Sequence, residues 1–301
     1  MKHNIRQTLL PLLAALIWGT AFSAQSIAAE HMSAFTFNCC RSVVAALFLL
    51  ALDMAAARAI PGRTSILRLK KEQRRQLLPA GAACGAALFL ASYMQQLGMS
   101  GTSAGKAGFI TAMYIVIVPL LGLFQGKRPT ALLWGSVALA VAGLYFLCVT
   151  ENFSMVTSDL YILICALLFS VHILVIDRFS SEVDGIQMSC VQFAVAALLS
   201  ALGMFAAEQP SLGAVALCAG PILYAGILSS GVAYTLQILA QKDANPTVVS
   251  LLLSLESVFA ALGGAFLLGE RLERRELLGC LLMLVGVMLA QLPAASEKQH
   301  T

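Results

Sequence analysis

Two charged side chains lie deep inside long apolar runs of the sequence, where a charge is costly. Glu256 falls about ten residues into the run 246–268, and Arg41 falls about eight residues into the run 33–52. At a helical rise of about 1.5 Å per residue, both depths correspond to the middle of a membrane. A charge held there predicts a functional group rather than an incidental one.

These two charges have two interpretations. In the first, Glu256 binds a proton or a cation, and Arg41 holds a carboxylate or a phosphate of the substrate through two parallel hydrogen bonds. In the second, each is the fixed structural counter-ion of the other. Gln192 matches Arg41 in the repeat described below and is polar but neutral.

Neutral polar side chains in the apolar runs form a second group of candidates. The spacing Tyr-x-x-Gln occurs at 93–96 and recurs with Tyr234 and Gln237, and it places both groups on one helical face. This pattern predicts residues that line a cavity, with hydrogen bonding between helices as the alternative; Trp18 is expected to serve packing. The predicted substrate-binding residues are Arg41, Tyr93, Gln96, Tyr114, Gln192, Tyr234, Gln237 and Glu256.

The composition indicates which elements must position these residues. The chain has 301 residues, 59% of them hydrophobic and 11% charged, and a mean hydropathy of +0.85. This excludes a soluble enzyme and a disordered chain, and a net charge of +4 is too small to indicate a nucleic-acid partner. Ten apolar runs predict ten membrane-spanning helices, at 8–28, 33–52, 77–98, 103–124, 130–149, 159–176, 186–206, 214–237, 246–268 and 276–292.

Basic residues predict how these helices are oriented. With the N-terminus inside, 14 Lys and Arg fall on the inner side, seven of them in the polar connector 53–76, and three fall on the outer side. Because cytoplasmic loops are enriched in Lys and Arg, we expect both termini in the cytoplasm. We expect the protein itself in the plasma membrane.

The two halves of the sequence match each other weakly but in a constant order. The segments 15–18 and 166–169 are related by an offset of 151, 93–96 and 234–237 by 141, and 126–128 and 269–271 by 143. The predicted units are therefore 1–152 and 153–301, each with five helices. An odd number of helices per unit inverts the second unit in the membrane, an arrangement typical of secondary transporters.

Several local motifs then identify a family. They are Ile17-Trp18-Gly19-Thr20, the segment 107–111 with Pro119, the segment 253–260 followed by 269–271, and Leu278-Gly279 with Gly286-Val287. Together they resemble an EamA-type permease of the drug/metabolite transporter superfamily. The resemblance implies ten helices in two inverted repeats around a central cavity, with the fifth and tenth helices peripheral. Many members of that family carry proline at the position of Ser257, so this chain departs from the pattern there.

One motif suggests an enzyme and is expected to be a coincidence. Gly101-x-Ser103-x-Gly105 fits a serine-hydrolase pattern, with Asp159 and His172 following in hydrolase order. That motif requires a strand-to-helix turn, which nothing in the sequence predicts. Eight cysteines in or beside apolar runs and four scattered histidines predict neither a metal site nor a cofactor.

The sequence therefore predicts an all-α membrane protein that moves a small polar, amino-acid-like metabolite, by export and alternating access. Its expected partners are that substrate, the lipid bilayer and, as a candidate coupling ion, the proton, with no nucleic acid. The alternatives are an integral-membrane enzyme, or a scaffold that transports nothing.

Overall fold

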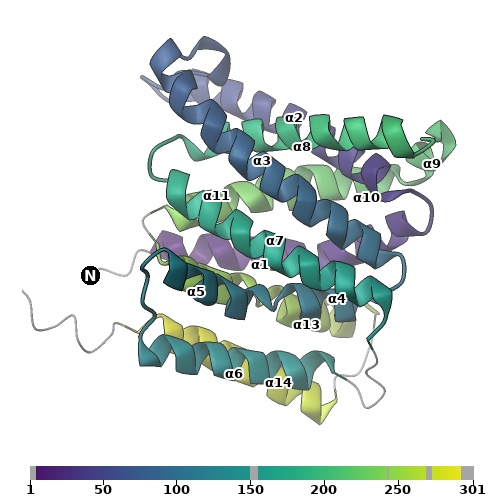
Figure 1. Cartoon of the computed structure of the whole chain (residues 1–301), viewed down its shortest axis with the longest axis vertical. Helices are drawn as coiled ribbons and strands as arrows, with labels where there is room; N and C mark the ends of the chain where they lie inside the picture. Colours follow the sequence, from purple (N-terminus) through teal and green to yellow (C-terminus); the bar gives the residue numbers. More distant parts are fainter. Residues whose placement is uncertain (1–4, 150–154, 243, 269–272, 293–301) are drawn as a thin grey trace, which may run out of the picture.

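The structure is a computed structural model that describes residues 5–149, 155–242, 244–268 and 273–292, and every element in these ranges is a helix (Figure 1). The prediction of an all-α protein is confirmed. The helices are α1 (Ile5–Ala29), α2 (Ala34–Ala59), α3 (Lys71–Met99), α4 (Ala104–Thr111), α5 (Tyr114–Phe124), α6 (Ala131–Cys148), α7 (Thr157–Phe179), α8 (Gly185–Ala207), α9 (Leu212–Leu217), α10 (Ala219–Leu223), α11 (Tyr234–Gln241), α12 (Pro246–Leu253), α13 (Glu256–Leu268) and α14 (Arg274–Ala290). A 3-10 turn, η1 (Ile66–Arg68), and a π-helix, η2 (Tyr224–Ala233), complete the order.

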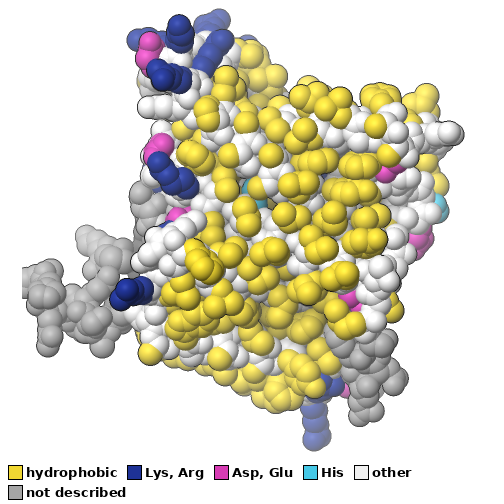
Figure 2. Space-filling view, in the orientation of Figure 1, with side chains coloured by type: hydrophobic (Ala, Val, Ile, Leu, Met, Phe, Trp, Pro, Cys, Tyr) yellow, Lys and Arg dark blue, Asp and Glu magenta, His cyan; other side chains and the backbone are white. Residues whose placement is uncertain are grey.

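Eight helical segments of the described residues are long and apolar enough to cross a membrane. A shorter apolar helix follows over 246–262, and α14 covers the last predicted run with 17 residues. The polar connector is shorter than predicted, because α2 continues to Ala59 and α3 already begins at Lys71. Leucines such as Leu47, Leu198 and Leu202 are exposed, where a bilayer would cover them. Figure 2 shows hydrophobic side chains spread over most of one face of the molecule.

The helices are arranged in layers. α2, α3 and α8 form one edge of the bundle, α1, α7 and α11 lie in the middle, and α6 and α14 form the opposite edge (Figure 1). α6 and α14 approach closely because Gly143 and Gly279 face each other: a Cβ on either glycine would lie 2.7 Å from the carbonyl oxygen of the other. Gly81 and Gly85 admit α8 against α3 in the same way, as small residues do in membrane bundles.

Both described ends of the chain lie on the same side of the bundle. The hydroxyl of Thr8, near the start of α1, donates to Oε1 of Gln291, just beyond α14, at 2.8 Å. Lys and Arg side chains gather along this end of the molecule (Figure 2).

Two predicted spans are interrupted in the middle, which the sequence interpretation did not anticipate. The run 103–124 divides into α4 and α5 at Ala112–Met113, and the run 246–268 divides into α12 and α13 at Ser254–Leu255. In both places the backbone switches to tighter hydrogen bonds three residues apart, such as Met113 N to Ile110 O and Leu255 N to Leu252 O. The second break ends two residues before Ser257, so the helix is interrupted here without a proline.

Candidate functional site

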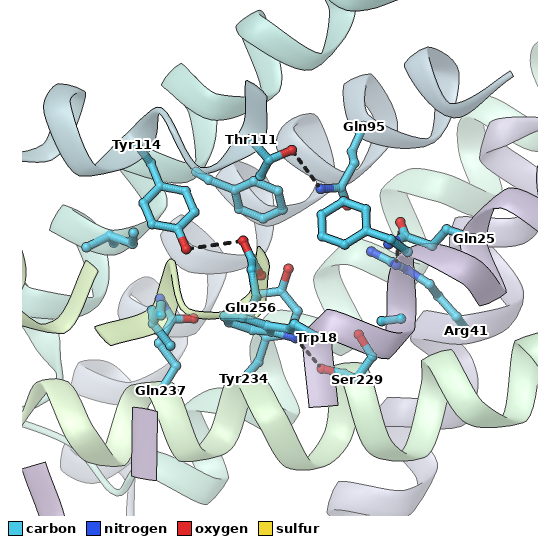
Figure 3. Close-up of a pocket in the computed structure, with 15 residues that line it drawn as sticks. Trp18, Gln25, Arg41, Gln95, Thr111, Tyr114, Ser229, Tyr234, Gln237 and Glu256 are labelled. Carbon is cyan, nitrogen blue, oxygen red and sulfur yellow. Dashed lines mark hydrogen bonds between the residues drawn. The ribbon is translucent and has the colours of Figure 1, made fainter. Parts of the chain in front are cut away.

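The two interrupted helices meet beside α1 and border a pocket that is also lined by α1, α2, α3, α7, η2 and α11 (Figure 3). The pocket has about 490 Å³ of empty space, counting its open mouth. Its walls come from both halves of the chain. The lining residues are Trp18, Ala21, Phe22, Gln25, Arg41, Gln95, Thr111, Tyr114, Phe169, Ile173, Ser229, Tyr234, Gln237, Leu253 and Glu256.

Glu256 is the first residue of α13 and is only 4% exposed. Tyr114, the first residue of α5, donates its hydroxyl to Oε1 of Glu256 at 3.2 Å. α13 can lie this close to α1 because Gly19 has no side chain: a Cβ there would lie 2.7 Å from the carbonyl oxygen of Glu256. The breaks in the two helices therefore bring a phenol and a carboxylate together in the pocket.

Arg41 is buried on the opposite side of the pocket and is poorly satisfied. The only hydrogen bond from its side chain to another described residue runs from Nη1 to Oε1 of Gln25, at a long 3.4 Å. Its Nε is buried and has no partner in the described part of the chain, and its guanidinium lies 5.7 Å from the ring centre of Phe37. A buried guanidinium with free donors is suited to an anionic group that enters the pocket.

Arg41 and Glu256 do not form an ion pair. Both residues are described, and no nitrogen of Arg41 lies within 4.0 Å of a Glu256 oxygen. Figure 3 shows them on separate sides of the pocket, Glu256 beside Tyr114 and Arg41 beside Gln25. The pocket thus presents one acidic and one basic group, with aromatic and amide side chains between them.

An aromatic wall closes one side of the pocket. The rings of Trp18 and Tyr234 meet edge to face, with their centres 4.8 Å apart. The indole Nε1 of Trp18 donates to the carbonyl oxygen of Ser229 at 3.1 Å. Ser229 belongs to the π-helix η2, a rare kind of element that is frequent at functional sites. Trp18 therefore lines the pocket as well as packing within the bundle.

The remaining predicted site residues lie in three different places. Gln237 lines the central pocket with Tyr234. Gln192 is fully buried behind the pocket, where Oε1 lies 3.1 Å from Nε2 of His172. Gln96 donates to the main-chain oxygen of Gln25 at 3.1 Å. Gln96 and Tyr93 line a separate depression near Glu30 and Glu208.

Of the eight predicted residues, five therefore line the central pocket: Arg41, Tyr114, Tyr234, Gln237 and Glu256. Gln25, Gln95 and Thr111 also line it and were not among the predicted set. Gln25 and Gln95 had a usable signal, an amide inside an apolar run. Ser229 had none, because it contributes a main-chain carbonyl that only the π-helical backbone exposes to Trp18.

The hydrolase-like motif does not form a catalytic group. Ser103 is exposed and its Oγ accepts from the backbone of Lys106 at the start of α4, while His172 is fully buried and lies beside Gln192. Asp159 is engaged by Thr102 and Lys106. No cluster of three or more potential metal ligands occurs in the described residues.

Comparison with known proteins identifies the class. A sequence model of the EamA-like transporter family matches residues 6–149 and matches again over residues 156–292. The chain belongs to the EamA-like transporter family and is a multi-pass membrane protein of the drug/metabolite transporter type.

Two individual proteins resemble it over nearly its whole length. An uncharacterized transporter of Archaeoglobus fulgidus is 30% identical over 287 residues, which cover 93% of this chain and 84% of the relative. A protein of known crystal structure superposes with a TM-score of 0.76 at 20% identity, covering 94% of this chain and 96% of the other. The second likeness concerns the fold alone.

Proposed function

We propose that the protein is a secondary transporter that exports a small metabolite carrying both an amine and an acidic group, by alternating access. The observation that carries this proposal is the pair of buried, unlinked charges in the central pocket, Arg41 and Glu256. Two unpaired charges at the centre of a membrane protein are costly unless a ligand or water meets them. A zwitterion of amino-acid type would complement both.

Each part of such a ligand has a matching group. Its carboxylate would accept hydrogen bonds from the unpartnered guanidinium of Arg41, and its ammonium would approach Glu256. Gln237 and Tyr234 would supply neutral contacts, while Trp18 and Phe169 would cover its apolar part. In the absence of the ligand, Glu256 would take up a proton, which makes the proton our candidate coupling ion.

Transport also requires an architecture that can open on either side. We propose ten membrane spans arranged as two inverted five-helix repeats, residues 1–152 and 153–301. The double family match supports this, as does the equal placement of the two helix breaks. Tyr114 and Glu256 are 142 residues apart, between the offsets of 141 and 143 found by matching the two halves. Their hydrogen bond would then lie near the pseudo-two-fold axis, where such transporters bind substrate.

We propose further that both termini face the cytoplasm, with the protein in the plasma membrane. The Lys and Arg side chains gather at the end of the bundle that holds Thr8 and Gln291 (Figure 2). All eight cysteines are buried or half-buried, so single surface cysteines can be labelled in the otherwise native chain. Lys70→Cys should react with an impermeant maleimide only from the cytoplasmic side and Gln209→Cys only from the outside; the reverse pattern would refute the orientation.

A ligand series tests the substrate proposal. The purified protein would be heated with amino acids, with their methyl esters, which lack the acid, and with the corresponding deaminated acids. A ligand at 100 times its dissociation constant stabilises by about 2.7 kcal/mol, so only the zwitterions should raise the melting temperature clearly. Equal stabilisation by esters or by deaminated acids would contradict a two-charge site.

Two variants assign the charges within this series. Arg41→Gln should remove the discrimination between zwitterion and ester, and Glu256→Gln should remove the discrimination between zwitterion and deaminated acid. Gln192→Leu is the matched control, because Gln192 is buried outside the pocket and pairs with His172. It should change stability without changing the ranking of the ligands.

A further inference from the structure

A second pocket lies at the basic end of the molecule, apart from the central one. It is formed by the last turns of α2 and by the connector to α3, and it has about 760 Å³ of empty space, counting its open mouth. Three of its residues are arginines: Arg58, Arg63 and Arg68. Figure 2 shows basic side chains concentrated at this corner, where α2 ends and α3 begins in Figure 1.

The net positive charge of the chain is concentrated in the segment that includes this pocket. Residues 53–76 contain seven basic and two acidic side chains, a net charge of +5 against +4 for the entire protein. Arg58 and Arg68 are exposed, and neither has a carboxylate within 4.0 Å among the described residues. The guanidinium groups of Arg58 and Arg68 therefore have no carboxylate partner in the part of the chain that the structure describes.

The pocket is held in shape by the third arginine and a buried aspartate. Asp53 is fully buried and accepts from Oγ of Ser65 at 2.8 Å and from the backbone of Ile66 at 2.7 Å. Arg63 lies 3.4 Å from Asp53 and 2.9 Å from Asp184, the N-cap of α8. Arg63 is thus already countered and positions the connector, which leaves Arg58 and Arg68 free for a ligand.

Apolar side chains border the two free guanidiniums. Leu67 lines the pocket and is 58% exposed, and Met54 lies half-buried on the α2 side. Because α2 is a membrane-spanning candidate, its last turns lie where acyl chains give way to headgroups. Guanidinium groups beside an exposed apolar surface at that depth match a phosphate joined to acyl chains.

We infer that Arg58 and Arg68 bind the phosphate of an anionic phospholipid, whose upper acyl region packs against Leu67 and Met54. The lipid would be held where the two halves of the chain meet, since Asp53 also accepts from Gln187 of α8 at 3.2 Å. This site requires only that the protein spans a membrane, and it does not depend on the proposed substrate.

Lipid titration of the detergent-purified protein tests the inference. Dioleoylphosphatidylglycerol and dioleoylphosphatidylcholine would be titrated separately and followed by native mass spectrometry, with inorganic phosphate as a third probe. An interfacial arginine contributes about fivefold in affinity for an anionic lipid, so the wild type should prefer phosphatidylglycerol by about tenfold or more. Arg58→Gln with Arg68→Gln should reduce that preference to about twofold or less.

The matched control removes the same charge from the same connector. Lys70→Gln with Lys71→Gln deletes two exposed positive charges that do not line the pocket, and it should keep the preference in about 0.5 M salt, where distant charges are screened. Equal loss in this control would overturn the inference in favour of diffuse attraction. Competition by inorganic phosphate at the concentration of the lipid would overturn it in favour of a free-anion site. Arg58→Lys with Arg68→Lys, which keeps the charge but loses the planar fork, should fall between the other variants.

Discussion

The interrupted helices 104–124 and 246–268 share a geometry but differ in chemistry. Each breaks after eight helical residues and resumes at a residue that points into the central pocket. In the first half the flanking residues are Thr111 and Tyr114, and in the second they are Leu253 and Glu256. The same backbone break thus occurs twice, while only the second break carries a carboxylate.

This difference separates the backbone geometry, which both halves share, from the side-chain chemistry, which differs between them. A repeated break places two residues in contact at the centre, because Tyr114 donates directly to Glu256. Duplication alone would place identical groups there, either two phenols or two carboxylates. Instead, the phenol of Tyr114 keeps a hydrogen-bond donor beside Glu256, the only charged residue at the two breaks. This arrangement suits a site that exchanges a cation or a proton.

The largest effect is expected from Glu256→Gln, which removes that charge. We expect uptake of the best stabilising ligand into proteoliposomes to fall by about 100-fold, the equivalent of a lost charge-assisted hydrogen bond of nearly 3 kcal/mol. Tyr114→Phe removes only the neutral donor and should reduce the flux by about tenfold or less. Equal losses in the two variants would mean that the halves are chemically equivalent after all.

Melting temperatures of the same variants distinguish a transport site from a structural pair. Removing one partner of a buried ion pair costs about 3–5 kcal/mol, and removing the second partner recovers much of it. Because Arg41 and Glu256 are not paired, we expect Glu256→Gln to leave the melting temperature nearly unchanged, with no rescue by Arg41→Gln. Normal, pH-dependent flux in a stable Glu256→Gln protein would remove Glu256 from the mechanism.

The ends of the first interrupted helix provide the next comparison, because both are tied to α7. Lys106 in α4 pairs with Asp159 at 2.5 Å, and Lys127 beyond α5 pairs with Asp177. Asp159 is fully buried and accepts from Thr102 and from the backbone of Val156 as well, whereas Lys127 is 40% exposed.

Asp159→Asn should therefore cost about 3 kcal/mol of unfolding free energy, whereas Asp177→Asn should cost about 1 kcal/mol or less. Denaturant titration of the two purified variants measures both values. A larger loss for Asp177→Asn would show that the exposed pair, rather than the buried one, anchors this helix.

Close packing against the interrupted helices also differs between the halves. A Cβ on Gly19 would meet the backbone of α13 at 2.7 and 2.9 Å, whereas a Cβ on Gly108 of α4 would meet only the ring of Phe22 at 3.7 Å. Gly19→Ala should destabilise by about 1–3 kcal/mol, because two backbones must separate. Gly108→Ala should be neutral or stabilise by up to about 1 kcal/mol, since alanine favours helices. Thermal melting decides, and equal tolerance of both would contradict the close contact of α1 with α13.

Much of this fold could be predicted from the sequence, and the reasons are physical. Apolar runs of about 20 residues are a strong signal, so the helical segments fall where hydropathy placed them. The charges Arg41 and Glu256 were found because a charge inside an apolar run is rare. The breaks at Ala112–Met113 and Ser254–Leu255 were missed, since none of those four residues is a glycine or proline that would announce a break.

The depth of a side chain in the membrane was also easier to predict than the neighbour that its side of the helix would face. The sequence match between the two halves pairs Tyr93 with Tyr234, yet Tyr234 lines the central pocket and Tyr93 stacks on Phe35 with ring centres 4.0 Å apart. A period of 3.6 residues places two residues on one face but does not say what that face meets. For the second half, the π-helix η2 precedes Tyr234 and changes the rotation of the helix, whereas α3 is a regular helix around Tyr93.

The smallest expected effect concerns what makes the second break. Ser254 stands at that break, and its Oγ donates to the main-chain oxygen of Leu251 at 2.8 Å, a local bond that bends helices. The first break has Ala112 in place of a hydroxyl and is interrupted all the same. If tertiary packing makes both breaks, Ser254→Ala should cost about 1 kcal/mol or less and leave ligand stabilisation and flux unchanged.

Ser250→Ala is the control: it removes the same kind of bond one turn earlier, to Thr247, and should have the same effect on stability. Loss of ligand binding in Ser254→Ala alone would show that the hydroxyl sets the position of Glu256, and that the two halves form the same break by different means.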